Sequence, residues 1–142
     1  MLAIRKANIN DLEAVAALYY YLKGAPVAPN ISAWQAIIKD EKTHVLLGYE
    51  EDKLVSSVTT SIIANLTHDA RPYALIENVV THEDYRARGH ASALLGHAKV
   101  LAQQENCYKI MLLTGSKQPS TLNFYRRAGY NSEDKTAFIQ WL

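Results

Sequence analysis

The sequence of 142 residues predicts a single α/β (α+β) domain with a mixed, mostly antiparallel central sheet flanked by helices. Three observations carry this prediction. Strand-like segments follow one another in the middle of the chain, with a polar hairpin turn between the first two. Segments with helical periodicity lie before this run and after it. The later part of the chain then alternates strand, helix and strand, which adds a parallel pair to the sheet and covers it with helices.

The first half of the chain predicts one strand, two helices and a hairpin. Residues 2–6 form the short first strand. Asn10 is expected to cap the first helix and Glu13 to complete its capping box, because an acidic residue stands three positions after the cap. Gly24 and Pro26 end that helix. The elements that follow are a helix over 31–39, a strand over 43–49, a turn at 50–53, a strand over 54–63 and a loop over 65–72.

The second half of the chain predicts strands and helices in alternation. The strand over 73–81 is apolar on both faces, which places it inside the sheet rather than at its edge. Pro119 fits the first position of a helix, and Gly129 fits the position just beyond its end. The elements are the strand over 73–81, an amphipathic helix over 89–104, a strand over 108–113, a helix from Pro119 and a last strand over 136–142. The whole order is β-α-α-β-β-β-α-β-α-β.

The composition and charge exclude several classes of protein. The net charge of +1 gives no footprint for nucleic acid, and no apolar run reaches the length of a membrane span, so neither is expected as a partner. The five histidines show no metal-ligand spacing, so no metal is expected. Cys107 is the single cysteine, and the N-terminus lacks the apolar core of a signal peptide, which together predict a cytoplasmic protein. No linker or repeat divides the chain, so residues 1–142 form one domain, and a homodimer is left open.

The most informative segment is the turn after the strand over 73–81. It reads Arg86-Ala87-Arg88-Gly89-His90-Ala91-Ser92 and opens a helix. Small side chains let the backbone approach a ligand closely, and the unpaired N–H groups of a helix start attract anions, so the segment suits a pyrophosphate. It is neither a Walker loop nor a dinucleotide fingerprint, because the glycine spacing differs. The other interpretation is an ordinary strand–helix turn with two solvated arginines.

Several features resemble the GNAT family of N-acetyltransferases. The turn matches the family motif Gln/Arg-x-x-Gly-x-Gly/Ala, and the segment 123–130 matches its aromatic-Tyr-x-x-x-Gly-Phe/Tyr signature. The helix start at Asn10-Asp11-Leu12 and the order of elements agree as well, so the resemblance covers nearly the whole chain. It implies a single GNAT-like N-acetyltransferase domain that uses acetyl-CoA as co-substrate. Direct transfer of the acetyl group to a primary amine is expected, without an acetylated cysteine. The short loop over 24–30 and the aromatic residues of the first two helices favour a small molecule as the acceptor.

The resemblance also assigns roles to residues. The backbone of residues 87–92 would hold the pyrophosphate, and one N–H at the end of the preceding strand would face the thioester oxygen. Gln118 or Asn123 would contact the cofactor amides. Tyr125 would protonate the leaving thiolate, because a tyrosine is protonated at neutral pH; the other interpretation is a core aromatic. The cofactor-binding residues expected are Val79, Val80, Thr81, Arg86, Ala87, Arg88, Gly89, His90, Ala91, Ser92, Gln118, Asn123 and Tyr125.

Glu77 stands out inside a strand that should be largely buried. A buried carboxylate is costly unless it is paired or used. Such a group is a candidate base for an ammonium substrate, directly or through water. The other interpretations are an ion pair with Arg71 or an exposed position at the rim. Glu77 and the segment 106–110 resemble the glucosamine-phosphate N-acetyltransferases in particular, whose second carboxylate is Asn78 here.

The acceptor amine is expected to enter opposite the cofactor. Tyr19, Tyr20 and Tyr21 cannot all face the core of one helix, so at least one is exposed or lines a cleft. Cys107 is expected to be a packed thiol and not a nucleophile. Two other functions stay open: a protein acetyltransferase acting on a chain terminus or a lysine, and a module that binds acyl-CoA without turnover. The residues expected at the acceptor are Tyr20, Trp34, Arg71 and Glu77. The guanidinium of Arg71 would clamp a carboxylate or phosphate.

Overall fold

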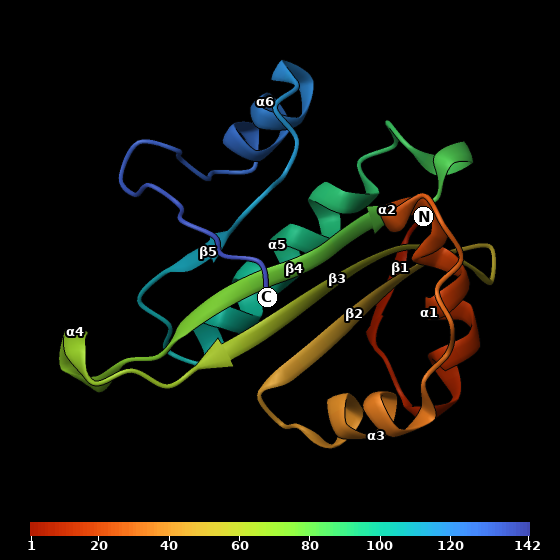
Figure 1. Cartoon of the computed structure of the whole chain (residues 1–142), viewed down its shortest axis with the longest axis horizontal. Helices are drawn as coiled ribbons and strands as arrows, with labels where there is room; N and C mark the ends of the chain where they lie inside the picture. Colours follow the sequence, from red (N-terminus) through yellow and green to blue (C-terminus); the bar gives the residue numbers. More distant parts are fainter.

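Five strands form one sheet in the spatial order β1-β2-β3-β4-β5 in the computed structural model, which describes residues 1–142 (Figure 1). The strands are β1 (Ala3–Lys6), β2 (Thr43–Glu50), β3 (Lys53–Ile63), β4 (Tyr73–Thr81) and β5 (Ile110–Leu112). Neighbouring strands are antiparallel except β4 and β5, which are parallel. The predicted mixed, mostly antiparallel sheet is confirmed, and β4 lies inside it as expected.

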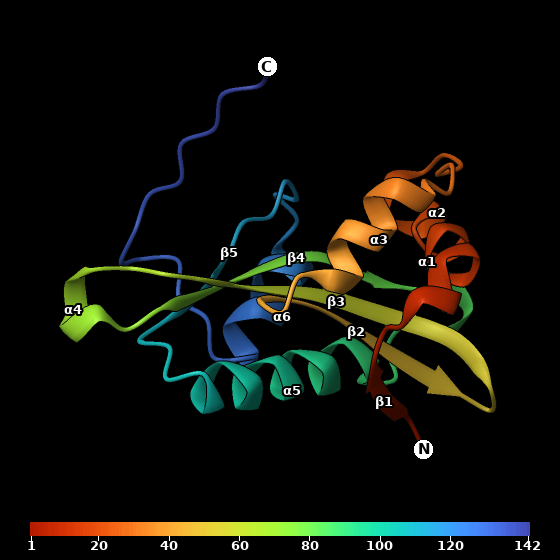
Figure 2. The ribbon, with the colours of Figure 1, turned by 90° about the horizontal axis from the view of Figure 1, so that it is seen from below.

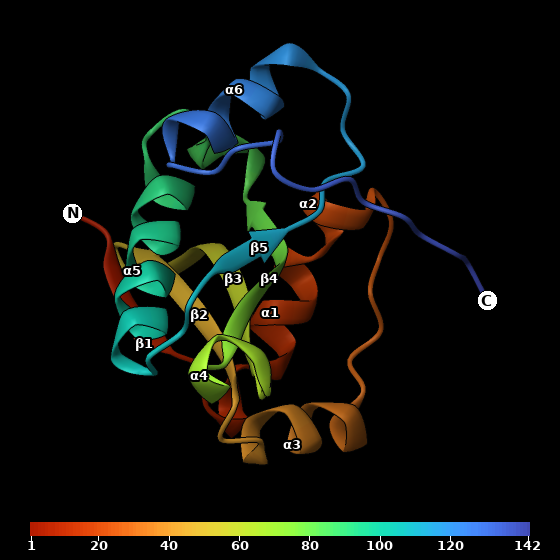
Figure 3. The same ribbon diagram turned by 90° about the vertical axis from the view of Figure 1, so that its left-hand side faces the viewer.

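Helices cover both faces of this sheet (Figure 2). One face carries α1 (Leu12–Leu18), α2 (Tyr20–Lys23) and α3 (Ile31–Lys39), and the other carries α5 (His90–Gln104) and α6 (Pro119–Arg127). Figure 3 shows the sheet between α5 on one side and α1 on the other. Three shorter helical segments complete the chain: 3-10 turns at Ile9–Asp11 and Glu83–Tyr85, and α4 (Thr67–Ala70).

The sheet separates two apolar layers. Leu46 and Leu47 are consecutive on β2 and enter different layers, because the side chains of a strand alternate between its faces. The layer under α1 and α3 contains Leu47 with Val15, Leu18 and Trp34. The layer against α5 contains Leu46 with Val58, Ile76, Leu94 and Leu95. Both faces of the middle strands are therefore buried, which fixes the strand register.

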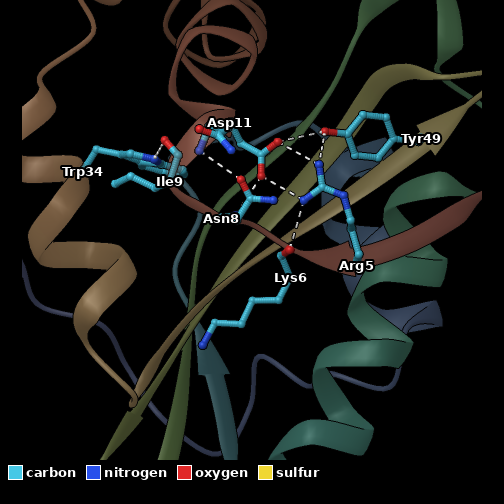
Figure 4. A network of polar contacts seen from close by, with 8 residues as sticks. Arg5, Lys6, Asn8, Ile9, Asp11, Trp34 and Tyr49 are labelled. Carbon is cyan, nitrogen blue, oxygen red and sulfur yellow. Dashed lines mark hydrogen bonds and ion pairs between the residues drawn. The ribbon is translucent and has the colours of Figure 1, made fainter.

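A network of polar contacts fixes the start of α1 against the sheet (Figure 4). The Asn8 side chain accepts the N–H of Asn10 at 2.9 Å, and the Asp11 carboxylate accepts the N–H of Asn8 at 2.7 Å, which forms a capping box. Arg5 donates to both oxygens of Asp11 at 2.7 and 2.8 Å and to the Tyr49 hydroxyl at 2.8 Å. The Arg5 guanidinium lowers the pKa of the Asp11 carboxyl. The expected cap at Asn10 with Glu13 is wrong, because the helical segment begins two residues earlier, where Asp11 can reach Arg5.

Most predicted elements are confirmed, with some changed bounds. The strand over 73–81 and the helix over 31–39 have the predicted bounds, and α5 begins one residue later than predicted. The predicted first helix is interrupted at Tyr19, which separates α1 from α2. The predicted strand over 108–113 shortens to the three residues of β5, and the loop over 65–72 contains α4.

The predicted last strand over 136–142 is wrong. These residues form no strand, and Figure 2 shows them leaving the body of the molecule. Phe138 and Trp141 are 91% and 85% exposed. A strand needs a neighbour to pair its backbone N–H and C=O groups, and this segment lies against none. The apolar alternation over 136–142 that predicted a strand is therefore present, but no neighbouring strand lies beside it.

Candidate functional site

The candidate site lies where β4 and β5 separate. The two strands pair only at Ala74, Leu75 and Ile76 of β4, opposite residues 110–112. β3 continues to pair with β4 as far as Thr81. The β5-facing edge of residues 77–81 therefore has no strand beside it. A bulge lies within the same stretch, because the register against β3 shifts and Asn78 has a left-handed φ of 52°.

The turn between β4 and α5 presents a row of free backbone donors. None of the N–H groups of residues 87–92 donates a hydrogen bond within the protein. Ala87 and Gly89 adopt left-handed φ values of 61° and 81°, and the N-terminus of α5 follows immediately. Successive N–H groups in such a turn form a concave anion site, and the dipole of the 15-residue α5 adds to it. The geometry therefore suits a bound phosphate or pyrophosphate.

The two arginines of the turn have different environments. Arg88 donates to the Glu50 carboxylate at 2.8 Å and to the backbone oxygen of Asp84 at 3.1 Å. The buried His90 ring contacts the other oxygen of Glu50 at 2.6 Å. Arg86 forms no ion pair and donates only to the backbone oxygen of Thr81, at 3.2 Å. Arg88 is thus neutralised and holds the turn in place, whereas Arg86 keeps a free charge for a ligand.

The strand edge and the turn share one cavity of about 490 Å³. Nine of the residues that the sequence predicts for the cofactor line it, and Arg88, Gln118, Asn123 and Tyr125 do not. Four residues that line this cavity were not among the predicted cofactor-binding residues: Tyr21, Leu22, Tyr85 and Phe124. The lining consists of Tyr21, Leu22, Val79, Val80, Thr81, Tyr85, Arg86, Ala87, Gly89, His90, Ala91, Ser92 and Phe124.

The segment expected to reach the cofactor from α6 is placed differently from the prediction. Phe124, not Tyr125, lines the cavity. Tyr125 packs on the apolar layer of α5, with its ring centre 5.0 Å from that of Phe124 and 6.3 Å from that of Tyr130. Burial raises the pKa of the Tyr125 hydroxyl, which keeps it protonated. Asn123 accepts a hydrogen bond from Arg126 at 3.1 Å, and Gln118 is exposed at the start of α6.

Glu77 is exposed, which corrects the expectation of burial. Its carboxylate has no hydrogen bond and no ion pair within the protein. The alternative of a pair with Arg71 is also wrong, because that guanidinium donates to the backbone oxygens of Asn106 and Cys107 at 3.1 and 2.9 Å. The physical reason is that β5 ends beside Ile76, so no neighbouring strand covers Glu77. The rim position is the interpretation that the structure supports.

The three successive tyrosines divide as their sequence predicts. Tyr20 is 48% exposed, and Tyr21 lines the cavity beside the strand edge. Tyr19 lines a second cavity of about 190 Å³ under α1 and α3. Their consecutive positions were the signal that one of them meets a cleft, although helical periodicity alone does not say which. The break at Tyr19 turns Tyr21 toward β4.

The second cavity contains no charged residue. Trp34 is one of its walls, but the residue is only 5% exposed and its indole N–H donates to the Ile9 backbone oxygen at 3.2 Å. Asn78 closes the cavity at the bulge of β4. The next residue along the strand, Val79, lines the first cavity. The two cavities therefore open on consecutive residues of one strand.

The surroundings of Cys107 can be checked in the same structure. Burial raises the pKa of the Cys107 thiol, which agrees with a packed thiol. No set of three His, Cys, Asp or Glu side chains is grouped as metal ligands would be. None of the helices combines the length and the apolar character that a membrane span requires.

Comparisons with known proteins agree with this geometry. A sequence profile of the Acetyltransferase (GNAT) family matches residues 9–130. A glucosamine 6-phosphate N-acetyltransferase from Trypanosoma brucei brucei is 26% identical over 140 residues, which cover 94% of this chain and 92% of that protein. The solved structure of a putative acetyltransferase from Agrobacterium tumefaciens str. C58 is 34% identical, with a TM-score of 0.91 and coverage of 98% of this chain and 99% of that one.

A more distant structure shares the fold. The glucosamine-6-phosphate N-acetyltransferase from Arabidopsis thaliana is 16% identical, with a TM-score of 0.81 and coverage of 100% of this chain and 98% of that one. The match of the family profile to most of the chain, together with the relative at 34% identity, shows the family. The chain belongs to the GNAT family and is an N-acetyltransferase.

Proposed function

We propose that this chain transfers the acetyl group of acetyl-CoA directly to the primary amine of a small molecule. The observation that carries the proposal is the row of free N–H groups over residues 87–92, which lies beside the open edge of β4 in one cavity. The row and the unpaired Arg86 suit the pyrophosphate of the cofactor. The open strand edge suits the amides of its pantetheine arm, because these can pair with free backbone groups as a strand would.

The reaction needs groups that handle charge and protons. The amine nitrogen forms a bond to the thioester carbon, the carbon–sulfur bond breaks, and its electron pair leaves with the sulfur. A free N–H at the end of β4 would stabilise the oxygen as it gains charge. Glu77, exposed and unpaired, is our candidate for the group that takes the amine proton, directly or through water. Tyr125, protonated in its buried setting, is our candidate for the acid that protonates the sulfur.

The second cavity supports a small acceptor. It is walled mostly by apolar side chains and has the size of a small organic group, about 190 Å³. Because Asn78 and Val79 line different cavities, an amine held in the second cavity would lie near a thioester held in the first. Trp34 remains a candidate wall for the acceptor. Tyr20, which is 48% exposed, remains a candidate contact for the acceptor. Arg71 remains a candidate clamp for a carboxylate or phosphate, because two of its donors bind backbone oxygens and its charge has no acidic partner.

The first test is binding of CoA and acetyl-CoA, measured as a thermal shift. A ligand at 100 times its Kd stabilises the fold by about 2.7 kcal/mol. Gly89→Leu should abolish the shift, because Gly89 lines the cavity beside the free N–H groups, where a leucine would occupy space and strain a turn residue with a φ of 81°. Gly96→Ala is the matched control, since this glycine lies within α5 with free space around it. An unmoved melting temperature of the wild type in millimolar CoA would contradict the proposal.

The second test is turnover, measured as thiol release from acetyl-CoA against a panel of amines. Small alkyl, aryl and amino-sugar amines are compared with peptides that carry a free N-terminus or a lysine. If only the peptides are acetylated, the acceptor is a protein and not a small molecule. Binding of CoA without thiol release against any amine would favour a module that binds acyl-CoA without catalysis.

A further inference from the structure

We infer that Tyr21 is a catalytic hydrogen-bond donor to the thioester oxygen and that His82 is the positioning residue that holds it. The inference rests on the proposed function, since it concerns the same acetyl transfer. Tyr21 lines the same cavity as Val79 and Val80 of the open edge of β4. Its hydroxyl oxygen lies 3.0 Å from Nε2 of His82, which directly follows β4.

The hydrogen bonds of His82 determine where its ring proton lies. The backbone N–H of Asp84 donates to Nδ1 at 3.2 Å. A backbone N–H can only donate, so Nδ1 is the unprotonated nitrogen of a neutral ring and Nε2 carries the proton. The contact between His82 and Tyr21 is therefore Nε2–H donating to the phenol oxygen. The direction of the His82–Tyr21 hydrogen bond therefore follows from the contact between Nδ1 and the Asp84 N–H.

The same direction leaves the proton of the Tyr21 hydroxyl available. Because the phenol oxygen accepts from His82, its own O–H must find another acceptor, and the protein provides none within hydrogen-bond distance. Tyr21 is also held firmly: its ring centre lies 4.3 Å from that of His82 and 5.5 Å from that of Tyr20, which meets it edge to face. Tyr85 packs edge to face on His82, at 5.3 Å between ring centres.

A fixed donor of this kind is what a developing oxyanion requires. As the amine attacks, the thioester oxygen gains charge, and a donor already oriented in the free enzyme stabilises it without further reorganisation. The proton stays on Tyr21 throughout, so no proton is gained or lost at this residue. The Nε2–H of His82 polarises the phenol and strengthens its donation. This role is separate from that of the acid that protonates the sulfur.

Two substitutions at His82 separate its two hydrogen bonds. The oxygen of an asparagine can accept the N–H two residues on, as Nδ1 does, but its amide does not reach Tyr21. A glutamine is one methylene longer, so its amide N–H can reach the phenol oxygen while the contact to the Asp84 N–H is lost. Both variants lose the ring contacts with Tyr21 and Tyr85, so they are compared with each other. His82→Asn should have the higher melting temperature of the two and lower kcat about tenfold, the effect of one lost hydrogen bond. His82→Gln should lower the melting temperature and keep most of kcat.

Tyr21→Phe is the direct test. Its kcat should fall roughly 10²–10³-fold, as for loss of an oxyanion donor, while the CoA-induced thermal shift stays unchanged. The double variant Tyr21→Phe/His82→Asn should be no slower than Tyr21→Phe alone, because His82 acts through the hydroxyl. Tyr108→Phe is the matched control, since that ring stacks on His68 away from both cavities, at 3.9 Å between ring centres.

The outcomes distinguish this inference from the proposed function. Thiol release by the wild type with a Tyr21→Phe rate equal to that of Tyr108→Phe would overturn the inference and leave the proposed function intact. If the kcat of His82→Asn and of His82→Gln instead falls in proportion to the loss of melting temperature of each variant, His82 has a purely structural role. If Tyr21→Phe does not fold, the opposite ranking of the two His82 variants by kcat and by melting temperature decides the matter. If the wild type neither binds CoA nor releases thiol, the proposed function fails and the inference with it.

Discussion

At the residue scale, charge pairing separates the groups that build the site from those that are free to act in it. Arg88 and His90 both bind Glu50, 38 and 40 residues away in the sequence, and so fasten the turn to the β2–β3 hairpin. Arg71 donates to two backbone oxygens and has no acidic partner. Arg86 and Glu77 have no ionic partner; Glu77 lies at the start of the free strand edge, and Arg86 lies in the turn that follows it. Their charges are available to the cofactor and to the amine.

Glu77→Gln tests the proposed base. Because the carboxylate is exposed and unpaired, the melting temperature should change little, as for other surface substitutions. The rate should fall most at low pH, where almost all amine molecules are protonated. The loss should shrink as the pH rises toward the pKa of the amine, about 10 for a lysine-like amine. Rates of both proteins from about pH 6 to 10 provide the measurement. A constant ratio of the two rates over this pH range would show that water or another residue accepts the amine proton.

Tyr125→Phe tests the proposed acid. The ring and its packing against Phe124 and Tyr130 are kept, and only the hydroxyl is lost. General acid catalysis is typically worth ~10²–10⁴-fold, so kcat should fall by that order while the affinity for acetyl-CoA is nearly unchanged. The rate must be measured where chemistry limits turnover. An unchanged rate would make Tyr125 a core aromatic, as its position off the cavity wall also allows.

At the element scale, the start of α1 determines where the tyrosines point. The capping box of Asn8 and Asp11 fixes the first turn, and Arg5 ties that turn to β1. The break at Tyr19 then gives α2 a direction of its own, which brings Tyr21 to the end of β4. Polar contacts at one end of the helix pair thus orient a ring at the other end.

The Asp11 carboxylate should give the fold a pH dependence at this element. Its pKa is lowered in the folded protein by hydrogen bonding to Arg5, so the stabilisation is present above the unfolded pKa, about 4. It is lost as the pH falls through the lower folded pKa. Asp11→Asn should therefore be less stable than the wild type at pH 7, and the difference should shrink below about pH 4. Urea unfolding at both pH values measures it, with Glu41→Gln, an exposed and unpaired residue, as the control.

At the scale of the whole molecule, the sequence predicts the layers and the sheet better than the contacts between distant segments. β4 and α3 have the predicted bounds because their apolar patterns are long and clearly terminated. The exposure of Glu77 could not be predicted, because it depends on where β5 ends. The pairing of Arg88 with Glu50 could not be predicted either, because it joins residues far apart in the chain. The alternation over 136–142 marks a segment able to form a strand, but it says nothing about a partner edge.

Removal of residues 136–142 should leave the fold intact. The segment forms no strand and adds no residue to either apolar layer. The truncated chain should keep the melting temperature and the CoA-induced shift of the full chain, and it should be more soluble, because Phe138, Ile139 and Trp141 are largely exposed. Light scattering and thermal unfolding of both chains measure this. A large loss of melting temperature would show that the segment contributes to the folded unit.

The short pairing between β4 and β5 also sets how easily the C-terminal segment of the chain, residues 110–142, opens. Residues 110–142 join the sheet through a ladder of three parallel residue pairs, whereas β2 and β3 pair over eight. Parallel ladders are slightly weaker per residue, so this C-terminal segment should unfold locally at a lower free energy than the hairpin. The amides of Ile110–Leu112 should exchange with deuterium faster than those of Val45 and Leu47. Bound CoA, filling the gap beside β4, should slow their exchange and make the domain open as one cooperative unit.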